Sequence, residues 1–124
     1  MRQEKREKNM SLSLEQRKSN TGVVIIEAKG KITIGEGDVK MRDVIKSLVD
    51  GGDKKLILNL EGVKYMDSAG VGELVSTYTS VKNAGGELYL VGVTGKILSL
   101  LEMTQLLRVF EVYTSTSDAL AEFG

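Results

Sequence analysis

The chain has 124 residues, enough for one domain with a core of its own and too few for two. Lys and Arg together number 17, as do Asp and Glu, and the formal net charge of zero argues against a nucleic acid or an anionic membrane surface as a partner. Because the chain contains no His and no Cys, it has no Ser-His-Asp or Cys-His nucleophile and no ordinary zinc site. We therefore expect a protein that is not an enzyme and uses no metal or cofactor.

The first ten residues are strongly charged and show no hydrophobic periodicity. They predict a flexible tail at residues 1–10 and a single domain over residues 11–124. Residues 1–9 are either a native tail or residues added ahead of Met10. The chain shows no secretory signal and no apolar stretch long enough to span a membrane, so we expect a cytoplasmic protein.

The first half of the chain predicts a β-hairpin followed by a helix. Residues 12–17 alternate weakly and residues 23–28 are rich in β-branched side chains, with a turn at 20–22 between these two strands. A short extended piece is expected at 31–34. Asp38 is the expected N-cap of a helix that ends at Gly51-Gly52. The apolar stripe of this helix comprises Met41, Val44, Ile45, Leu48 and Val49.

The second half of the chain alternates apolar strands with helices. Strands are expected at 56–60, 88–93 and 109–113. Helices are expected from about residue 68 to Gly85-Gly86, over 96–103, and from the polar run 115–118 to about 123. The stripe of the first of these helices comprises Val71, Leu74, Val75, Tyr78 and Val81. A helix, two glycines and a buried strand occur twice, which predicts an α/β fold whose mixed, mostly parallel sheet has about 4–5 strands, with about 4 helices.

The segment that follows the most buried strand is the candidate site, because ligands of α/β sheets bind beyond the carboxyl ends of the strands. The loop after this strand is expected over residues 61–72, and within it Asp67 and Ser68 stand where the next helix must start. Either side chain could cap this helix. Gly70 and Gly72 each cost about 1 kcal/mol in a helix relative to Ala. They indicate either the close approach of a partner or tight packing of the helix on the sheet.

Residues 56–93, and above all the run Tyr-Met-Asp-Ser-Ala-Gly-Val-Gly at 65–72, resemble the STAS domain, and within it the bacterial anti-sigma factor antagonists. This resemblance implies the STAS fold. It also implies that the unphosphorylated protein binds an anti-sigma factor and releases a sigma factor. The anti-sigma factor would be a serine kinase with a histidine-kinase-like ATPase fold that phosphorylates Ser68, and a phosphatase would reverse the reaction.

The resemblance, together with the charges nearby, also defines a candidate partner-binding surface. The family often has an acidic residue soon after its second strand, in a Gly-x-Leu-Asp pattern, whereas here the acids are displaced to Glu36 and Asp38. A second hypothesis is a constitutive scaffold, or a transporter-associated subunit, in which Ser68 only caps the helix. The candidate partner-binding residues are Asp67, Ser68, Ala69, Gly70, Gly72, Lys64, Glu36 and Asp38.

Overall fold

The computed structural model describes residues 12–123, so the tail expected at residues 1–10 lies outside the described part of the chain. Five strands and four α-helices alternate along this part, with one short 3-10 turn before the last strand. The strands are β1 (Leu12–Lys18), β2 (Val24–Ile32), β3 (Lys55–Met66), β4 (Glu87–Val91) and β5 (Glu111–Tyr113). The helices are α2 (Gly37–Asp50), α3 (Ser68–Asn83), α4 (Gly95–Met103) and α5 (Thr116–Phe123), and the 3-10 turn is η1 (Leu107–Val109).

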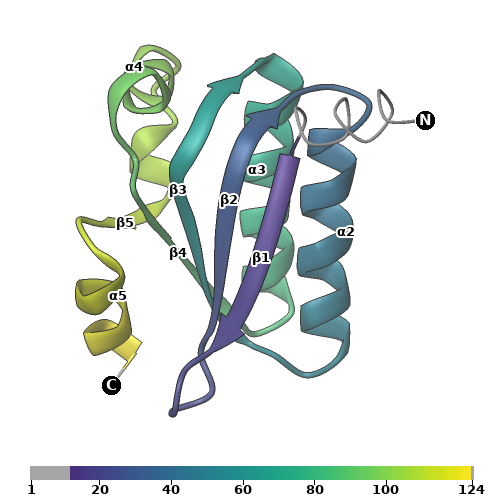
Figure 1. The fold of residues 1–124 in the computed structure, drawn as a ribbon, viewed down its shortest axis with the longest axis vertical. Coiled ribbons are helices and arrows are strands. Elements are labelled where there is room, and N and C mark those ends of the chain that lie inside the picture. The colour runs from purple at the N-terminus through teal and green to yellow at the C-terminus, as the bar shows by residue number, and fades with distance from the viewer. Residues whose placement is uncertain (1–11, 124) are drawn as a thin grey trace, which may run out of the picture.

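The strands form one sheet in the order β1-β2-β3-β4-β5, so neighbours in the chain are neighbours in the sheet (Figure 1). β1 is antiparallel to β2, and every other pair is parallel. The mixed, mostly parallel sheet with an N-terminal hairpin is therefore confirmed. Because the parallel strands all point the same way, their carboxyl ends meet at one edge of the sheet. Helices α2, α3 and α4, which follow β2, β3 and β4 in the chain, begin at this edge.

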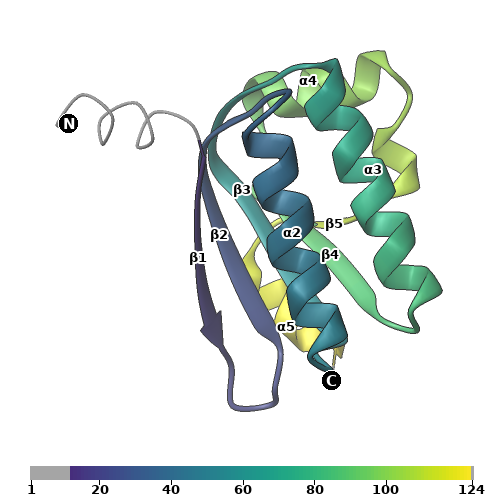
Figure 2. The same ribbon diagram turned by 90° about the vertical axis from the view of Figure 1, so that its right-hand side faces the viewer.

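The two faces of the sheet are covered unequally. Helices α2 and α3 lie side by side on one face, and α5 lies on the other (Figure 2). The larger core lies under α2, α3 and α4 and contains fully buried side chains such as Met41 and Leu74. On the opposite face Phe123 of α5 stacks on Tyr89 of β4 with ring centroids 4.3 Å apart. The core that positions the candidate site is thus the one beneath α2 and α3.

The predicted stripes of both helices lie on the core side, but four of their ten residues are only partly buried. In α2 Met41 and Ile45 are buried, Leu48 and Val49 are partly buried and pack against the core, and Val44 is partly buried without packing against it. In α3 Leu74 and Tyr78 are buried, and Val75 is partly buried where it packs against the core. The helical periodicity therefore identified the buried face of each helix correctly.

Two strands are longer than their sequence indicated. β3 runs to Met66 and α3 begins at Ser68, so the loop expected over 61–72 shrinks to Asp67 alone. β2 runs to Ile32, which takes in half of the piece expected at 31–34. β3 pairs with β4 only as far as Asn59. Its second half pairs with β2, and two register shifts in this pairing bring Gly30 opposite Val63 and Ile32 opposite Met66. Bulges interrupt the alternation of buried and exposed side chains along a strand. The sequence of this second half of β3 therefore shows no strand periodicity and predicts a loop.

The start of α2 also differs from expectation. The helix begins at Gly37, and Glu36 rather than Asp38 occupies the N-cap position. The backbone amide of Asp38 donates instead to the carbonyl of Thr33 at 3.1 Å. A side chain at Gly37 would collide with the carbonyl of Lys31, so glycine lets the helix start one residue early against the end of β2.

Candidate partner-binding site

The candidate site is built around the single residue that connects β3 to α3. β3 ends at the buried Met66, Asp67 is the N-cap, and Ser68 is the first residue of α3. Asp67 has extended backbone angles, φ −93° and ψ −177°, so it turns the chain abruptly from strand into helix. The buried strand below and the core face of α3 beside it therefore hold the start of the helix at the carboxyl edge of the sheet.

The carboxylate of Asp67 accepts two backbone hydrogen bonds. Its Oδ1 accepts from the amide of Gly70 at 2.8 Å, which caps α3, and its Oδ2 accepts from the amide of Ile34 at 3.0 Å, which lies in the loop between β2 and α2. The Ile34 amide, followed by the Gly70 amide, lowers the pKa of the Asp67 carboxyl below its usual value because both donors stabilise the charged form. Asp67 is therefore a fixed negative charge beside Ser68 at neutral pH.

Of the two capping residues that the sequence left open, the structure selects Asp67. Ser68 is exposed at the first position of α3, and its hydroxyl makes no hydrogen bond to any other residue within 12–123. This position places the Ser68 hydroxyl at the end of the helix where unpaired amides and the helix dipole favour negative charge. The side chain is thus open to a partner or a modifying enzyme.

The two glycines of the first turns of α3 have different environments. A side chain at Gly70 would collide with the carbonyl of Ile32 and come within 2.8 Å of the Met66 side chain, whereas one at Gly72 would meet nothing within 4 Å. Gly70 is buried and Gly72 is exposed. Tight packing of the helix on the sheet thus accounts for Gly70. A side chain at Gly72 would have open space, so packing does not account for this glycine.

The structure brings the β2–α2 loop to the start of α3 through the Asp67–Ile34 hydrogen bond. Glu36 is exposed at the end of this loop, and Asp38 is half-buried in the first turn of α2, where its carboxylate accepts from the amide of Val39. Lys64 is exposed on β3, next to the second register shift. The predicted site residues therefore come from three segments that meet at one edge of the sheet.

Sequence reasoning missed two apolar residues at this edge. Ile34 is 73% exposed in the β2–α2 loop, and Tyr65 is 50% exposed two residues before Asp67. Large apolar side chains in water near a binding site often contact a partner. Ile34 is a β-branched residue just ahead of a Gly-Glu-Gly run, and this placement in a loop could have indicated its exposure. The sequence interpretation assigned Ile34 to an extended piece instead.

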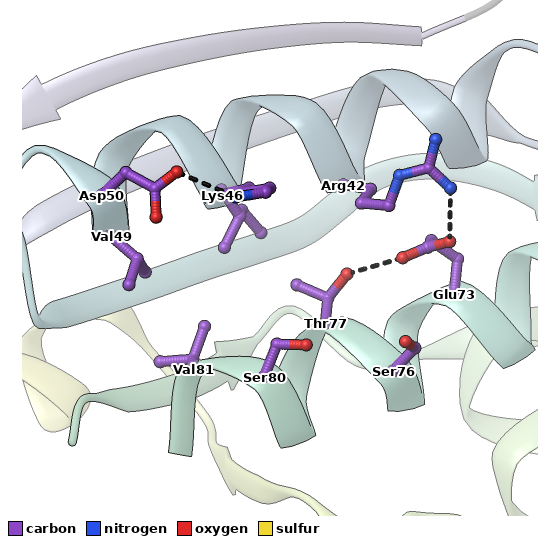
Figure 3. A pocket seen from close by; sticks show the side chains of 10 residues that line it. Arg42, Lys46, Val49, Asp50, Glu73, Ser76, Thr77, Ser80 and Val81 are labelled. Carbon is purple, nitrogen blue, oxygen red and sulfur yellow. Dashed lines mark hydrogen bonds and ion pairs between the residues drawn. The ribbon is translucent and has the colours of Figure 1, made fainter. Parts of the chain in front are cut away.

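A shallow groove of about 260 Å³ lies between α2 and α3 (Figure 3). Arg42 reaches across it to Glu73 at 3.5 Å, and Glu73 accepts a hydrogen bond from Thr77 at 3.1 Å. Of the residues of α3 that line this groove, Glu73 is the nearest to Ser68, five residues or about 7.5 Å along the helix axis. None of the predicted partner-binding residues lines this groove.

Among residues 12–123 no group of three or more Asp and Glu side chains is placed to hold a metal ion. The four α-helices of this same stretch are all too short or too polar to cross a membrane.

The five-stranded mixed sheet and its four α-helices define a small α/β domain. A model of the STAS domain matches residues 16–119, and the chain belongs to the STAS domain family. An anti-sigma F factor antagonist of Paenibacillus polymyxa is 25% identical over 91% of this chain and 96% of that protein. An anti-sigma-B factor antagonist of Staphylococcus aureus is 35% identical over 66% of this chain and 80% of that protein.

Solved structures show the same fold. The crystal structure of a Thermotoga maritima protein named as an anti-sigma factor antagonist matches this fold with a TM-score of 0.78 and 26% identity. The match covers 88% of this chain and 92% of the Thermotoga chain. The Bacillus cell fate determinant SpoIIAA in its phosphorylated form has a TM-score of 0.68 and 17% identity, with 90% of this chain and 100% of that chain covered. The predicted STAS fold is confirmed. The two curated relatives are named for antagonism of anti-sigma factors, which agrees with the expectation of a protein that is not an enzyme.

Proposed function

We propose that this protein is a cytoplasmic anti-sigma factor antagonist that is controlled by phosphorylation of Ser68. In its unphosphorylated form it binds an anti-sigma factor and releases a sigma factor. The anti-sigma factor is also the serine kinase, with a histidine-kinase-like ATPase fold, and a phosphatase restores the active form. The names of the curated relatives support the antagonist function.

The observation that carries the proposal is the division of roles between Asp67 and Ser68. Asp67 supplies the helix cap, so the exposed hydroxyl of Ser68 can be modified without loss of the cap. A phosphate on Ser68 would sit at the N-terminus of α3, where the helix dipole favours an anion. We therefore expect the phosphorylated protein to keep its fold and to change only its surface.

The charge at this surface explains how phosphorylation would stop binding. A phosphoserine carries about −1.5 to −2 charges at pH 7. These would lie next to the ionised carboxylate of Asp67, whose pKa is lowered by its backbone hydrogen bonds. Burying two adjacent like charges against a partner without a matching cation costs several kcal/mol, so the partner would dissociate.

The alternative is a constitutive scaffold in which Ser68 serves only as a helix cap, and the capping hydrogen bond accepted by Asp67 speaks against that role for Ser68. A constitutive scaffold would also bind its partner equally well with or without a negative charge at residue 68. The two functions therefore differ in one measurable property, which is the dependence of partner binding on the state of Ser68.

A phosphorylation assay tests the proposal directly. The protein is incubated with ATP and a purified anti-sigma factor of histidine-kinase-like fold from the same genome, and the products are analysed by mass spectrometry. We expect one phosphate on Ser68, none on Ser68→Ala, and normal phosphorylation of Ser99→Ala, in which an exposed serine of α4 is replaced. Binding of the anti-sigma factor without phosphorylation of Ser68 would instead support the scaffold.

A further inference from the structure

The carboxylate of Asp67 joins two segments that are far apart in the sequence. One oxygen holds the amide of Gly70 in the first turn of α3, and the other holds the amide of Ile34, 33 residues earlier in the chain. The amide of Asp67 itself donates to the carbonyl of Ile32 at 3.3 Å. The residue before Ser68 is therefore bonded through its backbone to the last residue of β2 and through its side chain to the β2–α2 loop.

The loop is packed closely at its two ends and not at Ile34. Gly37 and Gly70 both lie so close to the backbone of residues 31–32 that neither has room for a side chain. Ile34, by contrast, is 73% exposed and belongs to neither hydrophobic core. Its side chain buries little surface on folding, and the hydrogen bond from its amide ties this residue to Asp67.

We propose that Asp67 is a positioning residue that presents Ser68 and Ile34 as one docking surface for a protein partner. This inference rests on the proposed function, because the partner meant is the anti-sigma factor. It adds that Ile34 is an apolar anchor of the complex and that the Asp67 carboxylate orders this anchor before binding. An anchor that is already ordered loses less conformational entropy when the complex forms.

Two substitutions separate the contribution of the Asp67 carboxylate from that of the Ile34 side chain. Asn is as good an N-cap as Asp, so Asp67→Asn keeps an oxygen for the Gly70 amide. Its second group is an NH₂ donor, which cannot accept from the Ile34 amide. Ile34→Ala keeps the backbone amide and removes the apolar side chain. The matched control is Asp118→Asn, in the first turn of α5 on the opposite face of the sheet.

The binding experiment is a double-mutant cycle on the affinity for the anti-sigma factor. We expect Asp67→Asn to weaken binding about fivefold, Ile34→Ala about tenfold, and the double variant no more than Ile34→Ala alone. Asp118→Asn should bind as the wild type does. Fully additive losses would show that Asp67 acts without Ile34 and would overturn the inference.

A second measurement needs no partner. Amide hydrogen exchange followed by NMR should be faster at Ile34 in Asp67→Asn than in the wild type, while the Gly70 amide stays protected. Unchanged exchange at Ile34 would overturn the positioning role even if the complex forms. If the wild type binds no anti-sigma factor, the proposed function and the docking surface both fail. If the complex forms but the losses of affinity in the Asp67 and Ile34 variants are additive, only the link between these two residues is refuted.

Discussion

The carbonyl oxygen of Ile32, at the end of β2, occupies the place that a side chain at Gly70 in α3 would need. The close approach of helix and strand puts Ser68 at the edge of the sheet and lets Asp67 reach the β2–α2 loop. The packing of α3 on β2 therefore requires glycine at position 70. It does not require glycine at position 72, two residues further along the helix.

This contrast gives the first prediction. Gly70→Ala should destabilise the protein by about 1–3 kcal/mol, because the added methyl group overpacks a contact with the backbone. Gly72→Ala has open space and should stabilise α3 by up to about 1 kcal/mol through the higher helix propensity of Ala. Chemical denaturation of the two variants measures both effects. Equal stabilities would show that α3 does not pack on Ile32 as described.

The second prediction concerns the buried face of α3. Leu74 has no exposed surface, so Leu74→Ala should cost about 2–5 kcal/mol in the free energy of unfolding. Val75 is only partly buried, and Val75→Ala should cost about 1 kcal/mol or less. Thermal melts of the two variants give the comparison. A larger loss at Val75 than at Leu74 would mean that the helix is rotated about its axis.

A third prediction follows from the pKa of Asp67. Hydrogen bonds from Ile34 and Gly70 lower this pKa in the folded protein, so the carboxylate stabilises the fold above its unfolded pKa of about 4. This stabilisation is lost as the pH falls through the lower folded value. The difference in melting temperature between wild type and Asp67→Asn should therefore be largest near neutral pH and shrink below pH 4. A difference that stays constant down to about pH 2 would contradict the two hydrogen bonds.

The order of elements and the buried helix faces could be predicted because both depend on local periodicity. The spacing of Leu74 and Tyr78 marks the core side of α3, and the paired glycines mark the helix ends. Gly52 and Gly85, with φ of +104° and +85°, adopt the left-handed conformation that such ends need.

The geometry of the site could not be predicted, because it depends on contacts between distant segments. β3 reaches Met66 only because Ile32 of β2 pairs with it after two register shifts. The hydrogen bond from Ile34 to Asp67 spans 33 residues and has no local sequence pattern. For the same reason the sequence could not decide between Asp67 and Ser68 as the cap, nor between packing and partner contact at Gly70.

The most direct test of the account is the affinity of three proteins, the wild type, Ser68→Ala and Ser68→Glu, for the anti-sigma factor. All three should fold, since Asp67 caps α3 in each and a carboxylate at residue 68 lies at the favourable end of the helix. We predict that Ser68→Ala binds as tightly as the wild type and that Ser68→Glu binds at least about tenfold more weakly, or about 1.4 kcal/mol. Equal affinity of all three, with their melting temperatures intact, would contradict a switch at Ser68.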